Sequence, residues 1–209
     1  MHPLPSRRGV LLAAIAMAAT PLARARPAGA APSDAEARVN AFYAALLDTM
    51  KQAKRLGTKG RYERLLPVIL DTFDVPGMTR LAAGSAWLTA SPAQQAELTD
   101  AFSRLMTATY AARFDDFAGE RFEIATAIDQ PPNKLVRTRL VQSNGKIYNL
   151  NYLMRAAAGG WKIADVYLDG TISELAARRA EFSSIIKGGG PDALVALLRE
   201  RADKLLADS

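Results

Sequence analysis

The stretch WKIADVYLDGTISELAARRAEF, residues Trp161 to Phe182, decides the fold. It begins with the apolar alternation of a β-strand and ends with the apolar spacing of a helix. Only Asp169 and Gly170 separate the two patterns. Thr171 and Glu174 stand three residues apart, which is a capping-box pattern and predicts a helix start directly after the strand. The strand is therefore expected to close a sheet and to turn straight into a helix.

Three further strands are predicted before this one. The apolar alternation from Phe122 to Ile128 gives the first, and residues 135–141 give the second. Asn144-Gly145 is a hairpin turn signal that leads into the third strand, at residues 146–155. The four strands follow one another with short turns, which predicts an antiparallel meander.

Helices are predicted on both sides of the strands in the sequence. Before them, helices are expected at about residues 34–55, 61–73 and 78–83, and a long one begins at the Ser91-Pro92 start signal. After them, the helix that follows Asp169-Gly170 should break at Gly188–190, and a last helix should begin at Pro191. The fold class is α+β, with a four-stranded antiparallel sheet packed with about six or seven helices. Residues 31–209 are predicted to form a single domain.

Residues 1–30 have the pattern of a cleaved export signal. Arg7 and Arg8 precede an apolar run from Val10 to Ala19, and small residues follow around Ala30. The arginine pair is compatible with Sec or Tat export. Four of the 27 basic residues and none of the 21 acidic ones lie in this segment, so residues 31–209 carry a net charge of only +2. We expect a soluble periplasmic protein that does not bind nucleic acid.

Two residue types are missing from residues 31–209. The chain has no cysteine, and its single histidine is His2. Catalytic mechanisms that need a histidine or a cysteine nucleophile are therefore excluded, and so are the usual zinc, copper and haem ligand sets. No cofactor and no metal site are predicted.

The end of the chain and its middle carry a family resemblance. It rests on the pattern Trp161-x-Ile163-x-Asp165-Val166-x-Leu168-x-Gly170, then Phe182, a glycine-rich break and Leu194-x-x-Leu197-Leu198, together with Phe73-Asp74-Val75-Pro76-Gly77-Met78, Leu81-Ala82-Ala83-Gly84 and Trp87. The chain resembles the MlaC / toluene-tolerance family over about residues 35 to 205. Within that family it is most similar to the hopanoid-biosynthesis-associated HpnM branch.

The resemblance implies a periplasmic lipid carrier that serves an ABC-type lipid transporter and is not an enzyme. Acyl tails of a phospholipid or hopanoid would lie in an apolar cavity between sheet and helices. The expected partners are the lipid, the membrane-bound transporter components and, transiently, a membrane surface, and we expect a monomer. The candidate cavity residues are Met78, Phe102, Met106, Tyr110, Phe114, Tyr148, Leu150, Tyr152, Met154, Trp161, Ile163 and Val166. Each of these residues is also explained by ordinary core packing.

Two further candidate sites lie outside the cavity. Thr171 begins the predicted helix, where backbone N–H groups can hold a phosphate, unless Thr171 and Glu174 satisfy those groups themselves. A basic cluster is a candidate for membrane or partner docking, although cations near a helix C-terminus are also ordinary. Its residues are Lys51, Lys54, Arg55, Lys59, Arg61 and Arg64.

Two other functions remain compatible with the sequence. The first is a small pocket enzyme, such as an isomerase or dehydratase, in which Asp165 acts with Tyr148 or Tyr152. The second is an envelope scaffold with a filled core and no bound lipid.

Overall fold

The computed structural model describes residues 33–207, which form one α+β unit. The predicted signal segment lies outside the described residues. The helices are α1 (Asp34–Lys51), α2 (Ala53–Thr72), α3 (Val75–Ala83), α4 (Ser85–Thr89), α5 (Pro92–Arg113) and α6 (Glu174–Ala207). The strands are β1 (Arg121–Gln130), β2 (Asn133–Val141), β3 (Ile147–Ala157), β4 (Gly160–Leu168) and β5 (Ile172–Ser173).

The sheet is an antiparallel meander in the order β1-β2-β3-β4-β5. The predicted α+β class and the four long strands are confirmed. The fifth strand, β5, was not predicted, because its two residues only pair Tyr167 with Ser173 and Leu168 with Ile172 before α6 begins. Strand β2 shows the two faces: Val136 and Thr138 are buried, whereas Arg137 and Arg139 are exposed.

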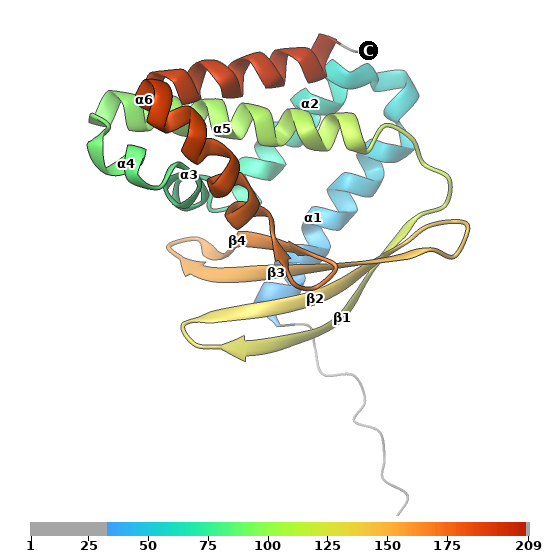
Figure 1. Cartoon of the computed structure of the whole chain (residues 1–209). Coiled ribbons are helices and arrows are strands. Elements are labelled where there is room, and N and C mark those ends of the chain that lie inside the picture. Colours follow the sequence, from blue (N-terminus) through green and yellow to red (C-terminus); the bar gives the residue numbers. More distant parts are fainter. Residues whose placement is uncertain (1–32, 208–209) are drawn as a thin grey trace, which may run out of the picture. The chain divides into compact units, whose positions relative to one another are not determined.

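The helices gather on the buried face of the sheet (Figure 1). Helix α1 packs directly on this face, and its buried Phe42 meets Phe73, Tyr110 and Tyr152 edge to face. Helix α5 packs between α2 and α6. Its start is the predicted capping box, in which Ser91 and Gln94 bond each other's backbone N–H groups. In the described part of the chain, no helix is both long and apolar enough to cross a membrane.

Two helix boundaries differ most from the prediction. Helix α2 begins at Ala53 and not at Arg61, and Gly57 (φ 60°, ψ 178°) kinks it without ending it. Helix α6 likewise continues past the predicted break, with one non-helical residue, Gly190 (φ 66°, ψ −159°). In both places a single glycine absorbs the change of direction, because glycine adopts a positive φ without steric cost.

Candidate functional site: an apolar cavity with a charged mouth

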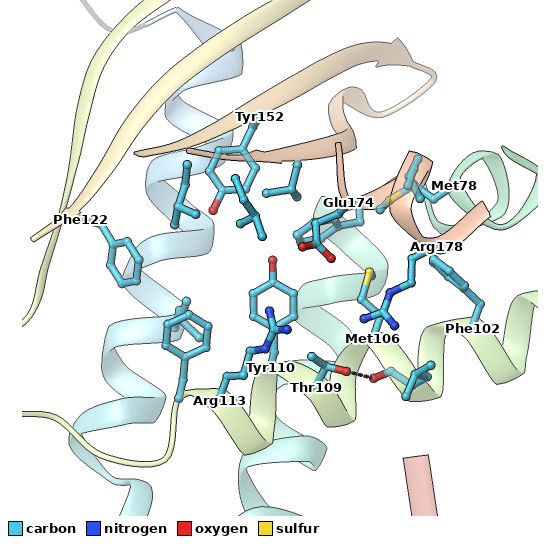
Figure 2. Close-up of a pocket in the computed structure, with 18 residues that line it drawn as sticks. Met78, Phe102, Met106, Thr109, Tyr110, Arg113, Phe122, Tyr152, Glu174 and Arg178 are labelled. Carbon is cyan, nitrogen blue, oxygen red and sulfur yellow. Dashed lines mark hydrogen bonds between the residues drawn. The ribbon is translucent and has the colours of Figure 1, made fainter. Parts of the chain in front are cut away.

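An apolar cavity of about 140 Å³ lies between the buried face of the sheet and the helices α5 and α6 (Figure 2). Twelve of the residues that line it are aliphatic, methionine or phenylalanine side chains, and two more are tyrosines. The lining residues are Leu46, Phe73, Met78, Phe102, Leu105, Met106, Thr109, Tyr110, Arg113, Phe114, Phe122, Leu150, Tyr152, Val166, Leu168, Glu174, Leu175 and Arg178. A surface of this composition suits hydrocarbon.

The structure brings eight of the twelve predicted cavity residues to this wall. They are Met78, Phe102, Met106, Tyr110, Phe114, Leu150, Tyr152 and Val166. The stripe on α5 and the inward face of β3 therefore meet across one space.

The other four predicted residues lie elsewhere. Met154 and Ile163 are fully buried and fill the core. Tyr148 lies under the ammonium group of Lys146, and Trp161 lies under that of Lys134. On β3, for example, only Leu150 and Tyr152 line the cavity, while Tyr148 and Met154 on either side of them do not.

Ten lining residues were not predicted from the sequence. Leu46, Phe73 and Phe122 come from three different elements and belong to the aromatic and aliphatic core around α1. Arg113 and Glu174 are charged residues at helix ends, so they are not part of an apolar stripe that would predict them. The remaining unpredicted residues are Leu105, Thr109, Leu168, Leu175 and Arg178.

Three tyrosines keep neutral hydroxyl groups, and two of them, Tyr110 and Tyr152, line the cavity. Burial raises the pKa of Tyr43, Tyr110 and Tyr152 well above that of a free tyrosine. Tyr43 shares a hydrogen bond with the hydroxyl of Thr138, which in turn donates to the Leu150 carbonyl. These hydroxyls therefore carry no charge at physiological pH, so the two tyrosines of the cavity wall stay compatible with an apolar ligand.

The junction between β4 and α6 is held by Asp165. One of its carboxylate oxygens accepts the backbone N–H groups of Val166 (2.8 Å) and Leu175 (3.2 Å). The other accepts the hydroxyl of Ser173 at 2.6 Å, and the Ser173 oxygen accepts the N–H of Ala176 at 2.9 Å. Asp165 is buried and is not among the residues that line the cavity. Asp165, the carboxylate considered for a pocket enzyme, thus makes the hydrogen bonds that hold the strand-to-helix turn.

The prediction that Thr171 caps the helix after Asp169-Gly170 is wrong. Thr171 is exposed and lies before β5, and its N–H donates to the Leu168 carbonyl. Ser173 takes the capping position, because β5 continues the sheet for two residues before the helix begins. The backbone N–H groups of Leu175 and Ala176 are satisfied by Asp165 and Ser173, so the helix start does not offer them to a phosphate.

The six basic residues considered for docking differ in burial: Arg61 is buried and the other five are exposed. Arg61 is buried and donates to the carbonyls of Ala111 (2.7 Å) and Ala53 (3.1 Å) and to the hydroxyl of Thr58 (3.0 Å). It ties the kink of α2 to the last turn of α5, so its assignment to a docking surface is corrected to a structural one. The other five are exposed: Lys51, Lys54, Arg55, Lys59 and Arg64.

Replacing Arg61 with methionine is expected to lower the free energy of unfolding by about 2 kcal/mol, because two buried carbonyls and a hydroxyl lose their donors. Lys59→Met removes one charge from the same cluster at an exposed position and should change stability by less than about 0.5 kcal/mol. Urea unfolding of both variants measures the difference. Equal stability of the two would contradict the structural role of Arg61.

Within residues 33–207, no cluster of three or more histidine, cysteine, aspartate or glutamate side chains is arranged to hold a metal ion.

Comparisons with known proteins identify a family and similar solved structures. A family model described as MlaC protein matches residues 40–200. A solved structure of the phospholipid-binding protein from Ralstonia solanacearum, in complex with a phospholipid, is similar with a TM-score of 0.73 and 25% sequence identity. That similarity covers 83% of this chain and 99% of the other. Comparison with curated proteins found no match. Since the family model spans most of the sequence, the chain belongs to the MlaC family.

Proposed function

We propose that this protein is a periplasmic lipid carrier that holds acyl tails in the cavity between the sheet and helices α5 and α6. The observation that carries the proposal is the apolar lining of this cavity, in a chain of the MlaC family whose structural neighbour is a phospholipid-binding protein. Each buried methylene group contributes about 0.8 kcal/mol. Tail burial therefore dominates binding, and no catalytic group is needed.

The cellular setting extends this proposal. Residues 1–30 act as the cleaved export signal, and residues 31–209 form the mature domain. The carrier exchanges lipid between envelope membranes together with an ABC-type lipid transport system. It works as a monomer, with the exposed basic residues Lys51, Lys54, Arg55, Lys59 and Arg64 available for docking to an acidic partner or an anionic membrane.

Phospholipid is the first candidate ligand, and a hopanoid is the second, in keeping with the resemblance to the hopanoid-associated branch. Both are long apolar molecules with a polar end. The enzyme alternative loses support because Asp165 is bonded within the fold and lies outside the cavity wall.

The test is lipid extraction and mass spectrometry on mature protein purified from its native envelope without detergent. About one phospholipid per chain is the expected result, with no lipid in a denatured control. About one hopanoid per chain would instead identify a hopanoid, the second candidate, as the ligand. No bound lipid, together with no uptake from labelled vesicles, would overturn the carrier proposal and favour an envelope scaffold.

A further inference from the structure

Three charged side chains line the otherwise apolar or neutral cavity. Among its lining residues, the charged ones are Arg113, Glu174 and Arg178. Arg113 is the last residue of α5, and Glu174 and Arg178 lie in the first two turns of α6. We call these three residues the charged mouth; in Figure 2, Arg113 lies beside Tyr110, and Arg178 lies beside Met106. The rest of the wall is apolar or neutral.

The pKa of Tyr110, which also lines the cavity, is affected by both a negative and a positive group. Burial is the main reason why the pKa of Tyr110 is raised, and the nearby carboxylate of Glu174 adds to the rise while the guanidinium of Arg113 opposes it. Arg113 and Glu174 therefore both lie close enough to the Tyr110 hydroxyl to act on it. A positive and a negative group thus flank the same polar atom of the cavity wall.

The charged mouth is free to bind a ligand. Within residues 33–207, Arg113 and Glu174 make no ion pair and no side-chain hydrogen bond. Arg178 lies 3.5 Å from Glu181, but Glu181 is also held by a closer contact with Arg201. Releasing Arg178 to another anion therefore leaves Glu181 with a partner.

The backbone at the start of α6 does not compete for that anion, because Asp165 and Ser173 already accept the N–H groups of Leu175 and Ala176. An anion at this end of the cavity must therefore be bound by side chains. Arginine suits a phosphate, since its planar guanidinium donates two parallel hydrogen bonds to phosphate oxygens.

We propose that the charged mouth binds the headgroup of a zwitterionic phospholipid, with the phosphodiester between Arg113 and Arg178 and the headgroup ammonium beside Glu174. This inference rests on the proposed function, because the tails must lie in the cavity for the headgroup to reach the mouth. A phosphoethanolamine group carries a negative charge followed by a positive one, which matches two cations and one anion. A glycerol headgroup supplies no cation for Glu174, so the carboxylate disfavours an anionic phospholipid.

The headgroup preference is tested with vesicles that contain equal amounts of phosphatidylethanolamine and phosphatidylglycerol with identical acyl chains. Protein is incubated with the vesicles and re-isolated, and its bound lipids are measured by mass spectrometry. The wild type should enrich phosphatidylethanolamine roughly fivefold, on the order expected for one charge-assisted contact at a partly exposed site. Glu174→Gln should bring the ratio to about one. Glu200→Gln, an exposed acid on the same helix and outside the cavity wall, is the matched control and should keep the wild-type ratio.

The arginines are tested by comparing phosphatidylethanolamine with diacylglycerol, which has the same tails and no phosphate. In the double variant Arg113→Gln/Arg178→Gln, the ratio of bound phospholipid to bound diacylglycerol should fall about 25-fold, because two charge-assisted contacts of about fivefold each are lost. The control is Arg80→Gln/Arg137→Gln, which removes two exposed arginines outside the cavity wall.

The outcomes separate the two proposals. A wild type that takes up neither phospholipid nor diacylglycerol overturns the carrier function itself. A wild type that binds lipid without headgroup preference, or a Glu174→Gln variant that keeps the preference, overturns the role of Glu174. An equal loss of phospholipid and diacylglycerol in the double arginine variant overturns the phosphate site, since the arginines would then support only the cavity wall.

Discussion

Replacing Met106 with tryptophan is expected to lower the affinity for lipid about 30-fold. Met106 lines the cavity from the middle of α5, and the larger indole ring would occupy space that a tail needs. Displacing two to three methylene groups costs about 2 kcal/mol at roughly 0.8 kcal/mol each. Transfer of a fluorescent phospholipid from donor vesicles, measured at several protein concentrations, gives the change in affinity.

The matched control is Leu88→Trp, which introduces the same side chain on α4 at a position that is 84% exposed. It should leave lipid uptake unchanged. Thermal unfolding should show that Met106→Trp costs at most a few kcal/mol, the range for an oversized side chain at a packed site. Wild-type lipid uptake by a folded Met106→Trp variant would contradict the assignment of this cavity as the tail site.

The second large effect is expected for Asp165→Ala, which should lower the free energy of unfolding by about 3 kcal/mol. The substitution removes the acceptor for two backbone N–H groups and the Ser173 hydroxyl at a buried position. Each buried donor left without a partner costs about 1–3 kcal/mol, and the chain relaxes to recover part of this loss. Urea unfolding, followed by far-UV circular dichroism, measures the change.

Asp169→Asn is the control for Asp165→Ala, since Asp169 is an exposed acid four residues away with a φ of 48°. Asparagine tolerates this left-handed conformation, so stability should change by less than about 0.5 kcal/mol. If Asp165→Ala unfolded like the wild type while an enzymatic turnover of the protein disappeared, Asp165 would be a catalytic acid and its role in holding the strand-to-helix turn would be refuted.

The sequence predicted the parts of the fold that depend on local patterns. Ser91 and Gln94 mark the start of α5 through a capping box formed within four residues, and Asn144-Gly145 marks a hairpin turn. The cavity-facing residues of α5 follow from helical spacing. These signals are readable because the interacting residues are close together in the chain.

What could not be predicted depends on contacts between distant segments. Arg61 looked like part of a solvated basic cluster, but it is buried and one of its three partners is the carbonyl of Ala111, fifty residues away. Ser173 and not Thr171 caps α6 because two residues of β5 extend the sheet first. The charged mouth combines the last residue of α5 with two residues near the start of α6, and no periodicity in either helix indicates that these residues line one cavity.

The size of the cavity has a consequence for how a carrier gives up its lipid. A volume of about 140 Å³ is close to that of an engineered void of about 150 Å³ that holds a single benzene ring, whereas two acyl tails need several times more. Loading must therefore move the walls outward. In a rigid protein, the departure of the tails would leave a void, and one of about 500 Å³ would cost about 12 kcal/mol at 24 cal/mol per Å³. Walls that close behind the departing lipid remove most of that cost, so elasticity of the core makes unloading thermodynamically accessible.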